Sequence, residues 1–246
     1  SVTPELTSEA AVYATVTGEA RTITLADGST VRLSPETRLE TAFTDEQRRV
    51  VLTEGAAYFD VIRDESRPFI VTADAARVTV LTGTGRAFCS GQDLGDGGRA
   101  DRLHLDQVLR DEYEPMLRAI LDSPVPVIAA VNGVAAGAGA NLALMCDVVI
   151  AAESAAFVQA FSRIGLVPDA GGSWALPRQV GLARALGAAL FAERIEARRA
   201  ADWGMIWEAV PDAEFAAHWL ARASYLASGP SKAFGAIKQA LRQSTN

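Results

Sequence analysis

The chain has 246 residues and 49% of them are hydrophobic, so it can bury a sizeable core as one large domain or two small ones. Its formal net charge of −7 argues against nucleic acid as the main partner, and no apolar run is long enough to predict a membrane-spanning helix. The two cysteines, Cys89 and Cys146, are too few for a disulfide framework and are expected to serve plain packing. With no charged-then-apolar leader at the start, this composition predicts a cytoplasmic protein.

Residues 1–77 have the pattern of short strands joined by turns. The segment 22–33 alternates apolar and polar residues around an Asp-Gly pair, which predicts a β-hairpin. The segment 49–61 has the same texture, with Gly55 as a bend or bulge, and 68–72 predicts one more strand. No convincing helix pattern occurs in this part, so we expect a small all-β segment.

The remaining residues, 78–246, alternate between strand and helix patterns. Such alternation implies parallel strand pairing with right-handed crossovers, and therefore an α/β fold. The predicted elements are a strand at 77–81, a helix with an apolar stripe at 105–121, a strand at 124–131, a helix at 141–145, a strand at 148–151, and mainly helices after Pro177.

Three segments of this second part carry the pattern of a ligand site. Gly137-Ala138-Gly139 comes just before a predicted helix, where small residues let a ligand approach unpaired N–H groups at the positive end of the helix dipole. Such a turn suits a phosphate or an enolate oxygen. The alternative, a dinucleotide fingerprint, lacks a third glycine and an acidic residue at the expected places. The segments 81–94 and 161–172 match this turn in kind.

In this order, and with Asp202-Trp-Gly-Met-Ile-Trp207, the three segments resemble the crotonase (enoyl-CoA hydratase/isomerase) superfamily over residues 78–246. The likeness is closest to its epoxyphenylacetyl-CoA isomerase branch. It implies a ββα spiral core, here incomplete at both ends, and a homotrimer or hexamer. It also implies an acyl-CoA thioester as substrate, with CoA as part of that substrate and no other cofactor.

The resemblance also implies an oxyanion hole made by two backbone N–H groups, those of Ser90 and Ala138. Each such donor typically contributes roughly 3–4 kcal/mol to transition-state stabilisation. The residues implied to bind the substrate and its CoA are Ser90, Gly91, Gln92, Asp93, Leu94 and Ala138. Ordinary structural roles stay open, namely a simple turn at Ser90-Gly91 and a helix cap at Asp93.

The proton carrier implied by the resemblance is Asp169. Hydratases of the superfamily use two glutamates, which fall here at Asn141 and Phe161, and neither of these side chains can transfer a proton. This argues against addition of water. We expect Phe161 to be an apolar wall that raises the pKa of the Asp169 carboxyl. The alternative is that Asp169 only caps a turn or helix.

Histidine and cysteine patterns predict no metal site. The two histidines, His104 and His218, lie in helical segments far from the three motifs, and we expect both to be surface or packing residues. No pair of cysteines has the spacing of metal ligands.

Residues 1–77 resemble the periplasmic domain of FecR-type sensors, through the segments 25–33, 54–61 and 67–71, although a generic β-meander is the alternative. The two likenesses meet inside one strand pattern near residues 76–83, so the chain resembles a fusion. Three hypotheses follow: a CoA-thioester isomerase, a sensor-like binding module fused to an inactive crotonase scaffold, or two halves with no joint function. Acyl-CoA binding with turnover distinguishes the first from the second.

Overall fold

The computed structural model describes residues 9–62, 64, 66–67, 69–72, 78–92 and 105–244. The chain divides into two compact units, Ser1–Ala76 and Arg77–Asn246. The predicted junction between residues 77 and 78 lies at the edge of the segment 73–77, which is outside the described residues. Within the described ranges, no helix is long and apolar enough to cross a membrane.

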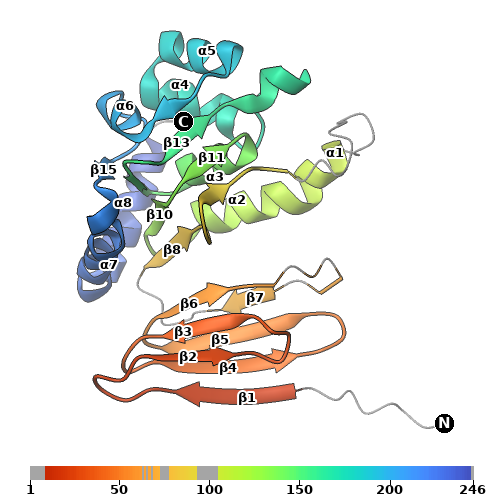
Figure 1. Cartoon of the computed structure of the whole chain (residues 1–246), viewed down its shortest axis with the longest axis vertical. Helices are drawn as coiled ribbons and strands as arrows, with labels where there is room; N and C mark the ends of the chain where they lie inside the picture. Colours follow the sequence, from red (N-terminus) through yellow and green to blue (C-terminus); the bar gives the residue numbers. More distant parts are fainter. Residues whose placement is uncertain are drawn as a thin grey trace, which may run out of the picture. The chain divides into compact units, whose positions relative to one another are not determined.

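The first unit consists of two sheets, with strand orders β1-β4-β5-β7 and β2-β3-β6 (Figure 1). The predicted hairpin is confirmed, because β2 and β3 pair antiparallel with Ile23 opposite Val31, and Gly28 takes a φ of 85° in the turn. The strands are β1 (Glu9–Ala14), β2 (Arg21–Thr24), β3 (Thr30–Leu33), β4 (Arg38–Phe43), β5 (Arg48–Glu54), β6 (Ala57–Asp60) and β7 (Phe69–Thr72).

Alternation along the strands builds the core between these two sheets. Val31 and Leu33 of β3 are fully buried together with Leu39 of β4 and Val50 of β5. Every second residue of a strand points to the same face, so each strand contributes its apolar set to one side. The core of the first unit is therefore closed by residues of both sheets.

A buried ion pair joins the hairpin turn to β5. The Arg48 guanidinium lies 2.6 Å from the Asp27 carboxylate, and their side chains are only 3% and 4% exposed. Arg48 also donates to the backbone oxygens of Ile62 and Arg67, at 2.8 and 2.9 Å. Burial alone would raise the pKa of Asp27, but hydrogen bonds from Ser29 and Arg48 hold it below its usual value. Arg48 thus fastens the segment after β6 to the sheet.

The second unit is α/β, as predicted, and contains two four-stranded sheets with orders β15-β12-β10-β8 and β14-β13-β11-β9. Its elements are β8 (Thr79–Thr82), β9 (Ala87–Cys89), α1 (Leu105–Val108), η2 (Leu109–Tyr113), α2 (Glu114–Leu121), β10 (Val127–Val131), β11 (Val134–Ala136), α3 (Ala138–Met145), β12 (Val148–Ala152), β13 (Ala156–Val158), η3 (Ala160–Ile164), α4 (Gly172–Val180), α5 (Leu182–Phe191), β14 (Ile195–Glu196), α6 (Ala197–Asp202), β15 (Glu208–Val210), α7 (Asp212–Ser228) and α8 (Ser231–Gln243).

Parallel pairing explains why β10 is a continuous apolar run. It pairs in parallel with β8 and β12, and all five of its residues are buried. A parallel strand covered on both faces buries every side chain, whereas a half-exposed strand buries alternate ones. Figure 1 shows helices packed around these strands, and the core extends into α3, α4 and α6.

The helix predicted at 105–121 is interrupted by a π-helical stretch, η2. In a π-helix the hydrogen bond spans five residues instead of four, which widens the turn, and such insertions are frequent at functional sites. On this segment Leu109, Tyr113, Leu117 and Leu121 line one cavity. The apolar stripe was predicted, but the widened turn was not.

Helix α8 is held by two cations that meet at Asp147, the residue before β12. Lys238 Nζ lies 2.9 Å from one Asp147 oxygen and Arg242 Nη2 lies 2.8 Å from the other. The buried Lys238 ammonium also donates to the Ile120 carbonyl at 2.7 Å, at the end of α2. These contacts fix α8 beside α2 and the carboxyl end of α3.

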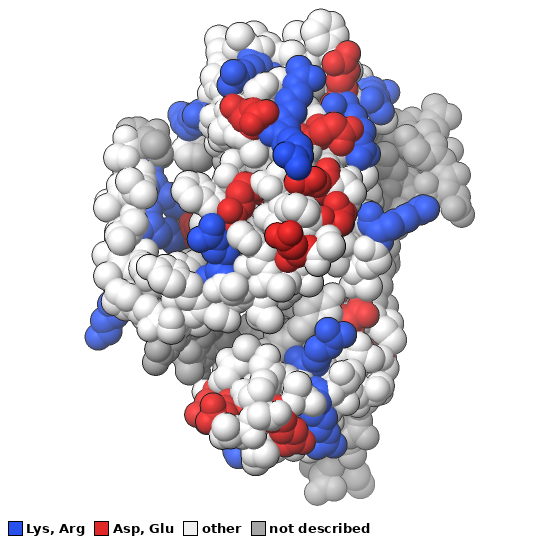
Figure 2. Space-filling view, turned by 60° about the vertical axis from the view of Figure 1, so that its left-hand side comes forward, with Lys and Arg blue, Asp and Glu red and all other residues white. Residues whose placement is uncertain are grey.

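Charges on the surface shown in Figure 2 are mixed in sign, with acidic and basic side chains side by side. Several ion pairs of the second unit are partly exposed, among them Arg198–Glu153 and Arg222–Glu208. The face in view therefore offers no broad basic patch of the kind that binds nucleic acid.

Candidate active site

The two glycine-rich turns of the sequence come together at one end of a sheet. Strands β9 and β11 are parallel neighbours, with Ala135 opposite Cys89, so the turns that follow them lie at the same edge. The contact is tight, since a Cβ on Gly139 would come within 2.3 Å of the Cys89 carbonyl oxygen. A Cβ on Gly91 would come within 3.2 Å of the Ala138 nitrogen. Glycine at both positions is what lets the two backbones approach.

Both predicted oxyanion donors belong to these turns. Gly137, with a φ of 54°, precedes α3 and donates its own N–H to the Val158 carbonyl at 2.8 Å. Within the described part of the chain, the N–H groups of Ser90 and Ala138 have no hydrogen-bond acceptor. The first N–H groups of a helix have no partner inside that helix, so Ala138 can donate to a ligand.

Asp169 lies in the turn that leads into α4. Its backbone carbonyl accepts hydrogen bonds from the Gly172 N–H at 2.7 Å and from the Asn141 side chain at 2.8 Å. Its side-chain Oδ1 is buried and has no hydrogen-bond partner among the described residues. Burial raises the pKa of this carboxyl above its ordinary value, and the backbone N–H of Asp169 itself opposes the shift in part. A carboxyl in this setting can hold a proton more readily than an exposed one.

The two positions where the resemblance would place glutamates are both buried. Asn141 in α3 is fully buried, and its amide contacts the Asp169 turn rather than solvent. Phe161, on the 3₁₀ helix η3, is 5% exposed, and a Cβ on Gly137 would lie 3.9 Å from the edge of its ring. Whether Phe161 is also the wall beside Asp169 stays a prediction.

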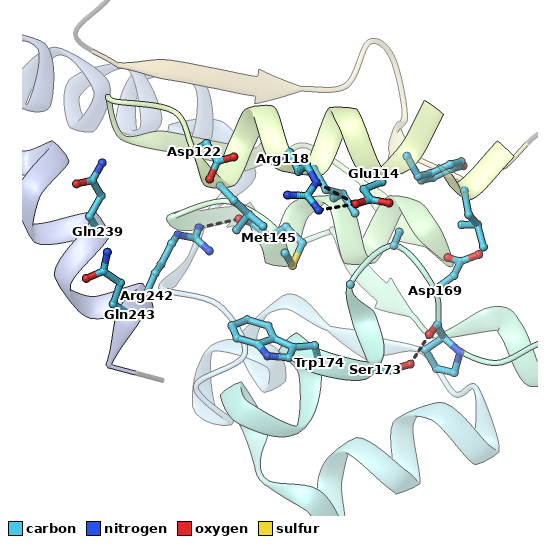
Figure 3. Close-up of a pocket in the computed structure, with 17 residues that line it drawn as sticks. Glu114, Arg118, Asp122, Met145, Asp169, Ser173, Trp174, Gln239, Arg242 and Gln243 are labelled. Atoms are coloured by element: carbon cyan, nitrogen blue, oxygen red, sulfur yellow. Dashed lines mark hydrogen bonds and ion pairs between the residues drawn. The ribbon is translucent and has the colours of Figure 1, made fainter. Parts of the chain in front are cut away.

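A cavity of about 770 Å³ lies between α2, α4 and α8 (Figure 3). Figure 3 shows Asp169 and Gln243 at opposite ends of it, with Trp174 and Arg118 between them. Its wall is formed by Leu109, Tyr113, Glu114, Leu117, Arg118, Leu121, Asp122, Met145, Pro168, Asp169, Ala170, Gly171, Ser173, Trp174, Gln239, Arg242 and Gln243.

Of the predicted site residues, Asp169 lies on this wall, whereas Ser90 and Ala138 do not. Ala138 lies directly behind the wall, because it packs in one apolar cluster with Leu117, Met145 and Ala170. The cavity and the paired turns are therefore neighbouring parts of one region.

Tyr113 is a residue of this region that the sequence analysis missed. Its hydroxyl donates to Gln92 Oε1 at 3.0 Å, which joins η2 to the first glycine-rich turn. Burial, and then the nearby carboxyl of Asp169 and thiol of Cys89, raise the pKa of Tyr113 to about 12. The phenol therefore stays a neutral hydrogen-bond donor at ordinary pH.

Other predicted residues have plainer surroundings. Asp93, Leu94 and His104 lie outside the described residues. His218 pairs with Glu208 at 2.8 Å on the surface of α7. Among the described residues, no group of three or more His, Cys, Asp or Glu side chains could hold a metal ion. Burial raises the pKa of the Cys146 thiol to about 12, which suits a packing role.

Comparison with known proteins gives two family matches. The sequence model of the family described as enoyl-CoA hydratase/isomerase matches residues 70–246, and that of the FecR protein matches residues 11–94. A probable enoyl-CoA hydratase of Rhodobacter capsulatus is 70% identical over 165 residues, which are 67% of this chain and 64% of the relative. The 1,2-epoxyphenylacetyl-CoA isomerase of Escherichia coli is 50% identical over 173 residues, 68% of this chain and 65% of the relative.

The chain thus spans just under two thirds of the length of both relatives. Among solved structures, an enoyl-CoA hydratase from Mycobacterium avium subsp. paratuberculosis superposes with a TM-score of 0.62 at 32% identity. That superposition covers 84% of this chain and 82% of the other.

Proposed function

Because the chain belongs to the enoyl-CoA hydratase/isomerase family, we propose that it is a CoA-thioester isomerase in which Asp169 carries the proton. The observation behind this proposal is the setting of the Asp169 carboxyl. It lies on the wall of a large cavity and has a raised pKa, and one of its oxygens is buried with no partner within the described ranges. Acid/base groups work best when their pKa lies near the working pH, and burial shifts a carboxyl in that direction.

In the proposed reaction the thioester carbonyl oxygen accepts hydrogen bonds from the N–H groups of Ser90 and Ala138. The ionised Asp169 takes a proton from a carbon of the acyl group, and the electron pair moves into an enolate on that oxygen. Asp169 then returns the proton to a second carbon, so the double bond moves and the carboxylate is restored. The proton and the electron pair both return to the substrate, so the reaction needs no oxidant, reductant or metal ion. The CoA is part of the substrate.

Isomerisation is favoured over hydration by two side chains. Asn141 and Phe161 cannot activate water, and Asn141 is occupied by its hydrogen bond to the Asp169 turn. The likeness to the isomerase of Escherichia coli supports an epoxyphenylacetyl-CoA type of substrate. In that reaction Asp169 in its protonated form would donate a hydrogen bond to the ring oxygen. The apolar side chains of Leu117 and Met145 on the cavity wall suit an aromatic acyl group.

The test compares three thioesters on the purified full chain. We expect isomerisation of a 3-enoyl-CoA or of ring-epoxidised phenylacetyl-CoA, and very slow hydration of crotonyl-CoA. Phenylacetyl-CoA in D₂O is the simplest probe, because exchange of its α-hydrogens reports enolate formation without a complete turnover. Hydration of crotonyl-CoA at about 10 per second or more, a rate typical of enzymes, would contradict the proposed reaction type.

A second candidate is a sensor-like binding module joined to a crotonase scaffold without turnover. The FecR match over residues 11–94 favours it, because that match reaches into the first glycine-rich turn. In this case the chain would bind acyl-CoA, but it would neither isomerise a thioester nor exchange α-hydrogens.

A further inference from the structure

The side chain of Asn141 is part of a buried polar network beneath the Asp169 turn. Its Nδ2 donates to the Asp169 carbonyl at 2.8 Å, and its Oδ1 accepts from Gln159 Nε2 at 2.9 Å. Asn141 and Gln159 are both fully buried, and the side-chain oxygen of Gln159 has no partner in the part of the chain that the structure describes. Buried amides are costly unless they are hydrogen-bonded, so this network calls for an explanation beyond packing.

The turn that Asn141 contacts has an unusual backbone. Ala170 has a φ of 46° and the next residue, Gly171, has a φ of 79°. Left-handed backbone is unfavourable for a residue with a Cβ, such as alanine, and persists only where the surroundings impose it. Gly172 packs directly on the Asn141 amide, since a Cβ there would come within 2.2 Å of Nδ2.

We propose that Asn141 is a positioning residue, whose amide holds the Asp169 turn in the one conformation that presents the Asp169 carboxyl to the cavity. The proposal rests on the proposed role of Asp169. The Asn141 amide gives the Asp169 carbonyl a second hydrogen bond, beside the one from the Gly172 N–H, and a carboxylate at position 141 has no proton to donate. The Asn141 amide occupies the space that a Cβ at position 172 would need, so glycine at 172 and asparagine at 141 fit together. An ionised glutamate at position 141 could not donate to the Asp169 carbonyl, so this support of the turn depends on the amide.

The experiment separates positioning from simple stabilisation. Asn141→Leu keeps the approximate shape and removes both hydrogen bonds, but it leaves Gln159 unpaired. The double variant Asn141→Leu/Gln159→Leu removes both polar groups, and replacing both partners by apolar groups is often close to neutral for stability. Gln179→Leu is the matched control, because Gln179 also donates to a backbone carbonyl, that of Leu144, and also has an unpartnered buried oxygen.

Two readouts are measured on the full chain. The pKa of Asp169 is followed by ¹³C NMR of its carboxyl, assigned with Asp169→Asn, and this needs no substrate. The kcat and KM are measured on the thioester that the parent isomerises.

In both Asn141 variants we expect the pKa of Asp169 to fall toward its ordinary 3.8, because a loosened turn lets water reach the carboxyl. We expect kcat to fall roughly tenfold or more, because small misplacements of a catalytic group are costly. KM should stay within about twofold, because Asn141 itself does not reach the cavity.

The control Gln179→Leu should change neither readout. The inference is overturned if the Asn141 variants keep the parent pKa and kcat, or if the double variant regains both once its stability is restored. Should Asn141→Leu alone fail to fold, the double variant carries the test. A parent chain without isomerisation or exchange would refute the proposed function, and the NMR titration would still decide the role of Asn141.

Discussion

Asp169→Asn should lower activity and, at neutral pH, raise stability. Asparagine keeps the shape of the side chain but cannot exchange the proton. Positioned acid/base groups contribute about 10²–10⁴ to a rate, so kcat should fall roughly a hundredfold or more, or about 2.7 kcal/mol in barrier height. Substrate binding should change little, because the N–H groups of Ser90 and Ala138 remain. An Asp169→Asn protein with the parent kcat would remove Asp169 from the mechanism.

The stability effect follows from the raised pKa of Asp169 in the folded protein. Because the folded state favours the protonated carboxyl, ionisation costs stability as the pH rises through the folded pKa. The cost is absent below the ordinary value of 3.8, so Asp169→Asn should match the parent in acid and exceed it at neutral pH. One carboxyl oxygen is buried without a partner among the residues that the structure describes, and such a group typically costs about 1–3 kcal/mol. The side chain is only partly buried, so we expect about 1 kcal/mol, or about 2–4 °C in Tm for a unit of this size.

Denaturant unfolding at several pH values measures this gain. All four tryptophans belong to the second unit, at positions 174, 203, 207 and 219, so their fluorescence reports on that unit alone. Glu193→Gln is the matched control, because it neutralises an exposed carboxyl of the same unit. A loss of stability at every pH, or an equal gain in the control, would refute the argument.

Two further predictions concern other residues. Tyr113→Phe should lower kcat several-fold, because it removes the hydrogen bond that holds Gln92. The dependence of kcat on pH should stay unchanged between about pH 6 and pH 10, because burial and Asp169 raise the pKa of Tyr113 to about 12. A changed profile in that range would show that the phenol titrates there. Arg48→Met should destabilise the first unit by about 3–5 kcal/mol, because it leaves the buried Asp27 carboxylate without its opposite charge. Circular dichroism should show this loss of stability. An equal loss measured by tryptophan fluorescence, which reports on the second unit, would contradict the prediction.

Local patterns were enough to predict much of the fold. The hairpin around Gly28 follows from alternation and from a turn that requires positive φ, and both depend on neighbouring residues. The strand β10 follows from an unbroken apolar run. The family resemblance is confirmed by the match over residues 70–246. The expected homotrimer or hexamer stays a prediction, which sedimentation of the purified chain can test.

The site was predicted less completely, because its remaining features depend on contacts between distant segments. Tyr113 was missed because its stripe was read as a regular helix, and a π-helical turn is set by packing rather than by spacing. In the sequence, Asn141 was interpreted only as a residue that cannot transfer a proton where hydratases have a glutamate. Its partner, the carbonyl of Asp169, is 28 positions away in the sequence, and only the folded chain brings the two together. The sequence signal for a constrained turn was the glycine pair Gly171-Gly172, which follows Asp169 closely.

Two carboxylates of the second unit, Asp147 and Asp169, differ in how completely their oxygens are hydrogen-bonded. Asp147 accepts from the Val127 N–H, from Lys238 and from Arg242, so both of its oxygens are satisfied and it anchors α8. Asp169, by contrast, has a buried oxygen that no described residue contacts through a hydrogen bond. Folding alone would select the first arrangement, because an unsatisfied buried oxygen costs stability. The second arrangement is maintained by a turn with left-handed backbone at Ala170 and by the amide of Asn141. Among the described residues, that cost lies at the wall of a cavity near two N–H groups without an acceptor, and strained or perturbed groups cluster at functional sites, which supports the proposed proton transfer over a scaffold without turnover.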